Sequence, residues 1–306
     1  MAESPAVPSA KRYAVVTGAY KGIGFEICKQ LVSNGIGVVL TSRDENKGLE
    51  AVQKLKDSDF SDDQVIFHQL DVLDPDSIAS LADFIRTRLG KLDILVNNAG
   101  ISGVSLNPDV FQRATELSGG WPDGKQITWD RMATQNFDMV QQCIQTNYYG
   151  ARRMTEALVP LLELSDSARI VNISSSLGLL QFIPSEWAKQ WLNDLENLTE
   201  ERVDEVVNKF LKDFQEGMLE TNGWPLHFSA YRVSKAALNA YTRIVAKRYP
   251  SFCVNCVCPG FCKTDIVANV GLCTPAQGAE KPVMLALLPN HGPSGIFFSE
   301  MGSSCF

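Results

Sequence analysis

The stretch Thr17-Gly18-Ala19-Tyr20-Lys21-Gly22-Ile23-Gly24 separates a β-branched run that starts at Tyr13 from a helical segment that starts near Phe25. Glycines in this register let the chain turn tightly after a strand and bring its backbone close to a ligand. The free N–H groups at the start of the next helix would then stabilise a pyrophosphate. The stretch therefore predicts a dinucleotide-binding strand-turn-helix unit, with a plain glycine-rich turn as the alternative.

Similar short β-branched runs alternate with helical segments along the rest of the chain. Including the first, they span residues 13–17, 37–41, 65–70, 92–96, 170–173 and 252–257. This alternation is typical of an α/β fold with a doubly wound parallel sheet of the Rossmann type. Because such sheets bind ligands beyond the carboxyl ends of their strands, we expect the functional residues just after these runs.

Two long segments interrupt the alternation, and we expect both to be insertions on the substrate side of a single domain that spans residues 1–306. Residues 101–140 are polar and include a glycine-rich run that contains Trp121, whereas residues 176–230 are predicted to form a helical, lid-like insertion. We expect residues 1–10 to be a flexible N-terminus.

The second insertion contains apolar residues at the spacing of one helix face, which are Val203, Val206, Val207, Phe210, Leu211 and Phe214. Either Asn197 or Thr199 would begin this helix, and Gly217 would end it. Four aromatic residues of the insertion, Phe182, Trp187, Trp191 and Trp224, are predicted either to line an apolar pocket or to seat the insertion on the core.

The composition excludes several classes of partner. With 306 residues, 45% of them hydrophobic, the chain can bury a full core, and its net charge of −7 argues against a nucleic acid. No apolar run is long enough to span a bilayer, and the first residues lack the basic start and apolar core of a signal peptide. We therefore expect a cytoplasmic protein without a membrane partner.

The eight cysteines are expected to be reduced, because a chain of this size in the cytoplasm needs no disulfides. Four of them, Cys253, Cys256, Cys258 and Cys262, fall close together in the sequence. Since most of this run reads as a buried strand, we interpret these cysteines as small hydrophobic residues and predict no metal site.

The end of the second strand predicts which nicotinamide cofactor is used. An acidic residue there would bind the ribose hydroxyls of NAD, but the sequence has Ser42 followed by Arg43. Together with Lys21, these residues leave space and positive charge for a 2′-phosphate, which favours NADP(H). Asp44 could be the ribose ligand instead, but we interpret it as the N-cap of the next helix.

Two further strand ends supply candidate cofactor contacts. Asp71 and Val72 follow the third strand, where the Asp71 carboxylate could accept a hydrogen bond from the adenine amino group. The run Asn97-Asn98-Ala99-Gly100 follows the fourth strand, and its small residues permit a close approach of the backbone.

The catalytic candidates centre on Tyr231 and Lys235, which lie four residues apart and would share one face of a helix. A neighbouring ammonium favours the phenolate, so we expect Lys235 to lower the pKa of Tyr231. Ser174, Ser175 and Ser176 follow the fifth strand and offer hydroxyls that could donate to a substrate carbonyl. We assign no proton-transfer role to His68 or His227.

These motifs resemble those of the short-chain dehydrogenase/reductase family over nearly the whole chain. The resemblance selects Ser175, three residues before Gly178, as the catalytic serine, and it assigns Asn147 to a proton-relay water. It also implies that Lys235 binds the nicotinamide ribose, and that Thr264, after Pro259-Gly260, contacts the nicotinamide carboxamide. The implied cofactor contacts are Gly18, Lys21, Gly22, Ile23, Gly24, Ser42, Arg43, Asp71, Val72, Asn98, Ala99, Gly100, Tyr231, Lys235, Pro259, Gly260 and Thr264.

The long insertion before Tyr231 is similar to that of the monomeric carbonyl reductase branch, and above all to plant reductases of the menthone, neomenthol and salutaridine type. Tyr20 departs from the family, whose members usually have Asn there, so a hydrogen bond that braces the glycine loop is missing or replaced. A related reductase of carbon–carbon double bonds has Glu in place of the catalytic tyrosine. The presence of Tyr231 therefore favours carbonyl reduction.

The resemblance implies NADPH-dependent reduction of a ketone, or in reverse oxidation of an alcohol with NADP, on a cyclic plant-type metabolite such as a monoterpenoid or an alkaloid. The alternatives are an enone double-bond reductase and a non-catalytic NADP-binding protein. We expect a monomer, because the second insertion should cover the helix through which other family members associate.

Overall fold

The computed structural model describes residues 11–58, 60–61, 63–299 and 302–304, so the predicted flexible N-terminus lies outside the described residues. Eight strands form one central sheet in the order β10-β9-β8-β7-β4-β1-β2-β3, and every neighbouring pair is parallel except β9 with β10. The strands are β1 (Tyr13–Val16), β2 (Gly37–Ser42), β3 (Val65–Gln69), β4 (Ile94–Asn97), β7 (Arg169–Ile173), β8 (Cys253–Val257), β9 (Phe297–Ser299) and β10 (Gly302–Ser304). The predicted doubly wound sheet is confirmed.

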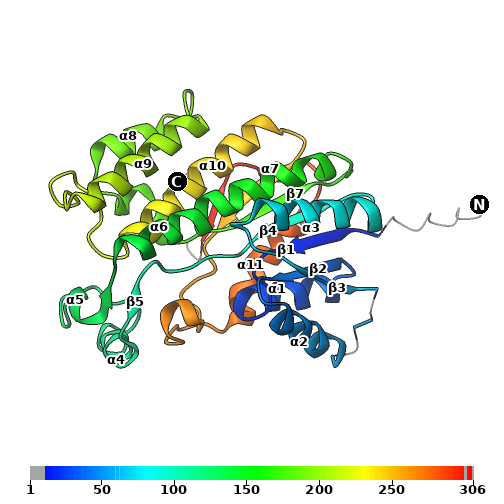
Figure 1. The fold of residues 1–306 in the computed structure, drawn as a ribbon, viewed down its shortest axis with the longest axis horizontal. Helices are drawn as coiled ribbons and strands as arrows, with labels where there is room; N and C mark the ends of the chain where they lie inside the picture. The colour runs from blue at the N-terminus through cyan, green and yellow to red at the C-terminus, as the bar shows by residue number, and fades with distance from the viewer. Residues whose placement is uncertain (1–10, 59, 62, 300–301, 305–306) are drawn as a thin grey trace, which may run out of the picture.

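Helices cover both faces of the sheet (Figure 1). On one face lie α1 (Gly22–Ser33), α2 (Glu45–Lys56) and α11 (Pro275–Ala286). On the other lie α3 (Pro75–Arg88), α6 (Phe137–Ile144), α7 (Ala151–Leu162) and α10 (Ser229–Arg248). None of the helices in the described part of the chain combines the length and apolar composition that a bilayer crossing needs.

The strand order reverses at β1, which pairs with β2 on one side and with β4 on the other. In a doubly wound sheet this switch point is where a ligand binds, beyond the carboxyl ends of the strands. The first insertion, the second insertion and the loop after β8 gather toward that end of the molecule, at the left of Figure 1.

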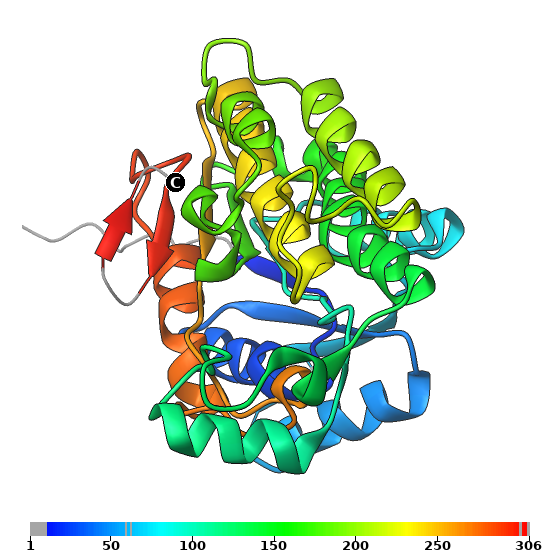
Figure 2. The ribbon, with the colours of Figure 1, turned by 90° about the vertical axis from the view of Figure 1, so that its left-hand side faces the viewer.

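The first insertion folds into α4 (Pro108–Ser118), α5 (Trp129–Met132) and a two-stranded antiparallel sheet of β5 (Ser105–Leu106) and β6 (Ala133–Thr134). These strands were not predicted, and neither were β9 and β10 at the sheet edge, which Figure 2 shows in red. Each is only two or three residues long, so neither alternation nor an apolar run identifies it.

The second insertion forms α8 (Glu186–Asn193) and α9 (Glu200–Gln215), which pack as an outer layer on α10. Thr199 is the N-cap of α9, because its hydroxyl accepts a hydrogen bond from Arg202 N at 3.3 Å. Asn197, the alternative start, instead donates to Asp194. Gly217 follows the last turn with φ +71°, as expected of a residue that ends a helix.

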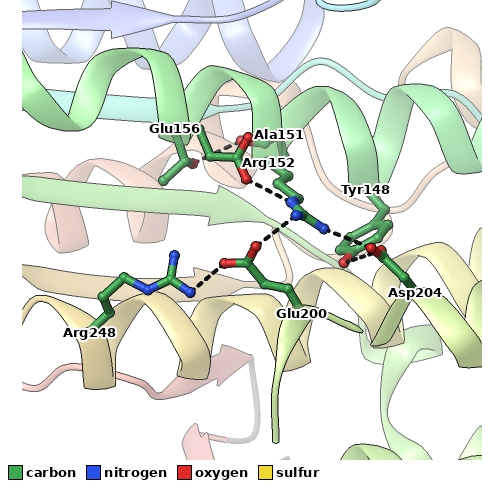
Figure 3. A network of polar contacts seen from close by, with 8 residues as sticks. Tyr148, Ala151, Arg152, Glu156, Glu200, Asp204 and Arg248 are labelled. Carbon is green, nitrogen blue, oxygen red and sulfur yellow. Dashed lines mark hydrogen bonds and ion pairs between the residues drawn. The ribbon is translucent and has the colours of Figure 1, made fainter. Parts of the chain in front are cut away.

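A network of ion pairs fastens α9 to the core (Figure 3). The Arg152 guanidinium on α7 contacts Glu156 at 2.8 Å, Glu200 at 2.7 Å and Asp204 at 3.0 Å. Arg248 on α10 holds the other oxygen of Glu200, at 2.7 Å. Because Glu200 and Asp204 belong to α9, this network fixes the insertion against both α7 and α10.

Candidate active site

Tyr231 and Lys235 lie in the first two turns of α10, whose N-cap residue Phe228 has a left-handed backbone with φ +51°. The Lys235 Nζ atom lies 5.6 Å from the centre of the Tyr231 ring. It also donates to the Ile173 carbonyl at the end of β7, at 2.7 Å. The side chain of Lys235 is 4% exposed, so the end of a strand and the start of a helix together bury an ammonium beside the phenol.

The protonation of this pair differs from the sequence-based expectation. Burial lowers the pKa of Lys235 to about 8. Burial also raises the pKa of Tyr231, and the side-chain hydrogen bond with Ser175 opposes that shift only in part. The expectation of a lowered pKa for Tyr231 is therefore wrong for the protein alone, because loss of solvation is the largest cause of the shift. At neutral pH the phenol keeps its proton.

Ser175 reaches Tyr231 because the chain after β7 lies directly on α10. It is the N-cap of a short 3₁₀ turn, η2 (Ser176–Gly178), and its hydroxyl accepts from Leu177 N at 3.2 Å. A Cβ atom at Gly178 would lie 2.6 Å from the Lys235 carbonyl carbon. The glycine thus permits the contact that brings the serine to the tyrosine.

Ser174 has a structural role, because its hydroxyl is buried and lies 2.5 Å from Asn239 Oδ1.

Asn147 lies in a π-helical turn, η1 (Gln145–Gly150), a form of helix that is frequent at functional sites. Its amide exchanges hydrogen bonds with the backbone of Ile101, accepting at 2.8 Å and donating at 2.9 Å. A Cβ atom at Gly100 would lie 3.2 Å from Asn147 Oδ1 and 3.6 Å from Lys235 Nζ. Asn147 and Lys235 therefore face the same glycine.

The glycine loop between β1 and α1 is braced from the end of β4. The Asn98 amide donates to the Thr17 carbonyl at 2.9 Å and to the Gly18 carbonyl at 3.2 Å. A Cβ atom at Gly24 would lie 2.4 Å from Asn98 Nδ2, so this brace requires a glycine at residue 24. Tyr20, the departure from the family, lies under two ammonium groups, with Lys21 Nζ at 5.1 Å and Lys47 Nζ at 6.0 Å from its ring centre.

The loop and the end of β2 suit a phosphorylated dinucleotide. Gly18 and Gly22 have φ of +62° and +58°, a left-handed conformation that only glycine adopts readily. Because neither residue has a side chain, a ligand can approach the backbone of the loop closely. At the end of β2 the Ser42 hydroxyl is buried without a hydrogen-bond partner among the described residues, and Arg43 beside it is exposed. Asp44 is the N-cap of α2 and accepts from Lys47 N at 3.1 Å, as interpreted from the sequence.

Lys21, a predicted cofactor contact, forms an ion pair that the sequence did not predict. Lys21 pairs with Asp265, across from the glycine loop, and this ion pair raises the pKa of Lys21. Asp265 follows Thr264 in the sequence. Thr264 lies close to the glycine loop, because a Cβ atom added at Gly22 would be 3.6 Å from Thr264 Cγ2. The loop after β8 therefore touches the glycine loop, and no local pattern in the sequence predicts that Asp265 takes part.

The remaining predicted contacts lie around the same strand ends. The Asp71 carboxylate accepts a hydrogen bond from Leu73 N at 2.9 Å. Val72 packs against Gly150, where an added Cβ atom would lie 2.8 Å from Val72 Cγ2. Ala99 contacts Gly18, and Ile23 lies in α1 against Gly278 of α11. Pro259 and Gly260 follow β8, where Gly260 has φ +93°.

An aromatic cluster beside Tyr231 was missed in the sequence. The centre of the Trp121 ring, in the first insertion, lies 5.8 Å from that of Phe111, 5.3 Å from Phe228 and 5.3 Å from Phe261. Tyr231 packs against the same cluster. Only the tertiary fold could reveal it, because its members come from α4, from the turn before α10 and from the loop after β8.

The three tryptophans of the second insertion favour the role of seating the insertion on the core. Trp224 is 2% exposed and donates to Asp213 at 2.7 Å, which supports the role of seating the insertion on the core. The rings of Trp187 and Trp191 lie 5.0 Å apart and are partly buried against the same core. His227 stacks on Trp129, and His68 packs on Phe84.

Comparisons with known proteins agree with this geometry. The family model described as short chain dehydrogenase matches residues 12–186. A (+)-neomenthol dehydrogenase from Capsicum annuum is 54% identical over 299 residues, which cover 94% of this chain and 95% of that protein. A (−)-isopiperitenone reductase from Mentha piperita is 55% identical over 302 residues, which cover 94% of this chain and 96% of that protein.

Among solved structures, that of salutaridine reductase from Papaver somniferum has a TM-score of 0.88 and 51% identity, and the match covers 95% of this chain and 100% of that chain. The family uses a nicotinamide cofactor and acts on small molecules. The chain is thus an oxidoreductase that acts on C=O or CH–OH groups, and it belongs to the short-chain dehydrogenase family.

Proposed function

We propose that the protein reduces a ketone on a cyclic plant-type metabolite, a monoterpenoid or an alkaloid, with NADPH, and that it oxidises the alcohol in reverse. The observation that carries the proposal is the half-buried residue Tyr231, whose phenol keeps its proton, which has Ser175 beside it and which packs against an apolar aromatic cluster. That arrangement provides a proton donor, a second hydroxyl donor and an apolar surface for the substrate.

Tyr231 and Ser175 act on the carbonyl oxygen. As the carbonyl carbon is reduced, negative charge develops on its oxygen, and the Tyr231 phenol gives that oxygen its proton. The Ser175 hydroxyl donates a hydrogen bond to the same oxygen and holds the substrate in line with the phenol. A positioned general acid of this kind contributes roughly 10²- to 10⁴-fold to the rate.

Lys235 and Asn147 assist Tyr231, the proton donor. The buried ammonium of Lys235 stabilises the phenolate that Tyr231 becomes once it has lost its proton. Asn147 faces the same space at Gly100, and we assign it the ordering of a water that returns a proton to Tyr231. In the oxidative direction the same groups work in reverse, with the phenolate accepting the alcohol proton.

The cofactor proposal rests on the glycine loop and on the end of β2. Backbone at Gly18, Gly22 and Gly24 would hold the pyrophosphate, while Ser42 and Arg43 would bind a 2′-phosphate. NADPH supplies the hydride when it is bound. Lys21 would join these contacts only after its ion pair with Asp265 opens, so the preference for the phosphorylated cofactor depends chiefly on Ser42 and Arg43.

The substrate class follows from the aromatic cluster and from the relatives. Trp121, Phe228 and Phe261 offer ring faces and edges, which suit a rigid apolar skeleton better than a charged chain. Two relatives with about half of their residues identical bear the names neomenthol dehydrogenase and salutaridine reductase, a terpenoid and an alkaloid enzyme. We propose that the protein works as a monomer in the cytoplasm, with α9 covering α10.

A second candidate is the reduction of the double bond of an enone, because one relative at 55% identity is named isopiperitenone reductase. Product analysis separates the two. The purified protein is given NADPH and a panel of cyclic terpenoid and alkaloid ketones that includes enones, and the products are identified by mass spectrometry. Alcohol products support ketone reduction, saturated ketones support the second candidate, and no NADPH consumption across the panel contradicts both.

A further inference from the structure

Two thiols outside the catalytic group lie against each other. The Sγ atoms of Cys262 and Cys273 are 2.6 Å apart, which is only about 0.6 Å longer than a disulfide bond. The backbones of the two residues pair in an isolated β-bridge, and Lys263 N donates to the Cys273 carbonyl at 2.8 Å. Bridged residues keep their Cα atoms within the range that a disulfide spans.

Of the four cysteines that fall close together in the sequence, only Cys262 belongs to this pair. Cys253 and Cys256 lie three residues apart in β8, so their side chains point to opposite faces of the sheet. Within the described ranges, no three His, Cys, Asp or Glu side chains come close enough to hold a metal ion. The thiol that Cys262 meets belongs to Cys273, at the other end of the next loop.

The loop between the two thiols, residues 263–272, lies against the glycine loop that is proposed to hold the cofactor. It carries Thr264, which approaches Gly22, and Asp265, which pairs with Lys21. Its other end leads through Cys273 into α11, which packs against α1. A covalent link between Cys262 and Cys273 would therefore fix both ends of the segment that faces the glycine loop.

We propose that Cys262 and Cys273 form a reversible disulfide that locks the 263–272 loop against the glycine loop and slows the exchange of NADPH. The oxidant is a peroxide. Cys273 is partly exposed whereas Cys262 is 3% exposed, so the Cys273 sulfur meets the peroxide first. It attacks one peroxide oxygen, the O–O bond breaks, and a sulfenic acid and one water form with hydrogen peroxide.

The Cys262 sulfur then attacks the sulfenic sulfur of Cys273. The S–S bond forms, the S–O bond breaks, and the hydroxyl leaves with the Cys262 proton as a second water. Overall, two thiols lose two electrons and two protons, and hydrogen peroxide is reduced to two waters. A dithiol such as dithiothreitol reverses the reaction by exchange and is itself oxidised.

The effect on NADPH rests on the proposed function, but the disulfide itself does not. For the disulfide, the full chain is treated with hydrogen peroxide, its remaining thiols are alkylated, and its peptides are mapped by mass spectrometry. We expect one cross-link, between Cys262 and Cys273, that dithiothreitol removes. Cys273→Ser should abolish it, whereas the control Cys253→Ser should retain it. A cross-link to other cysteines, or none at all, overturns the proposal.

For the lock, NADPH is displaced from the reduced and the peroxide-treated protein in a stopped-flow instrument, and its fluorescence is followed. We expect release to slow severalfold after oxidation in the unmodified chain and in Cys253→Ser, but not in Cys273→Ser. A mapped disulfide with unchanged NADPH release overturns the lock. A chain that forms the disulfide but never binds NADPH contradicts the proposed cofactor, and the mapping result still stands.

Discussion

Gly178 lies so close to Lys235 that a Cβ atom at residue 178 would be 2.6 Å from the Lys235 carbonyl carbon. This contact seats the chain after β7 on α10 and sets the position of Ser175 relative to Tyr231. It also gives a physical reason for the spacing between Ser175 and Gly178 that the sequence shows.

Gly178→Ala should therefore impair both folding and catalysis. The added methyl meets backbone that cannot yield without moving α10, and overpacking of this kind costs about 1–3 kcal/mol. We expect a lower midpoint in urea unfolding and a lower kcat, because Ser175 moves away from Tyr231. Gly120→Ala is the matched control, since its Cβ atom would lie 3.8 Å from Leu272. Equal effects of the two substitutions would contradict the account.

Asn98→Asp tests the brace on the glycine loop. The substitution keeps the shape of the side chain but removes the donor that binds the carbonyls of Thr17 and Gly18. Leaving such acceptors unpaired costs about 1–3 kcal/mol. We expect the KM for NADPH to rise more than kcat falls, measured by initial rates at saturating ketone. If Asn98 only contacted the substrate, the KM for the ketone would change instead.

The pH dependence of reduction should follow Lys235. Its pKa is lowered to about 8, so its ammonium is present below that pH and is lost as the pH rises through it. Because the charge stabilises the Tyr231 phenolate and is proposed to hold the cofactor ribose, kcat/KM for NADPH should fall above about pH 8. The raised pKa of Tyr231 keeps the proton donor intact over the same range. A profile that stays flat to pH 10 would rule out this role for Lys235.

Arg152→Met tests the attachment of the second insertion. The Arg152 side chain holds Glu200 and Asp204 of α9, and Glu200 is 10% exposed at its side chain. Removing one partner of such buried carboxylates costs about 1–3 kcal/mol. We expect a lower free energy of unfolding, whereas Arg86→Met, which breaks an exposed pair with Asp83, should leave it unchanged. Equal stability of both variants would mean that the network does not hold α9.

The sequence alone predicts those elements whose pattern lies within a short stretch of the chain. The glycine loop, the six longer strands and the face of α9 all follow from spacing within a few residues, and the structure confirms them. Thr199 and Asn197 are equivalent as helix starts in the sequence. The hydrogen bonds of the two side chains separate them, because Thr199 accepts from Arg202 N whereas Asn197 donates to Asp194.

What the sequence could not show depends on contacts between distant segments. The ion pair of Lys21 with Asp265 joins residues more than two hundred positions apart, and the approach of Cys262 to Cys273 depends on how the loop after β8 closes. The pKa of Tyr231 was predicted in the wrong direction because helical spacing gives the neighbour but not the degree of burial.

Tyr231→Phe, assayed by single-turnover reduction of a ketone that the unmodified protein reduces, tests the role of Tyr231 as the proton donor most directly. The phenylalanine keeps the ring against the aromatic cluster and removes only the hydroxyl. NADPH binding, followed by fluorescence titration, should be retained, while the rate of NADPH oxidation should fall by about 10²-fold or more. Retained binding with an undiminished rate would contradict the assignment of Tyr231 as the proton donor.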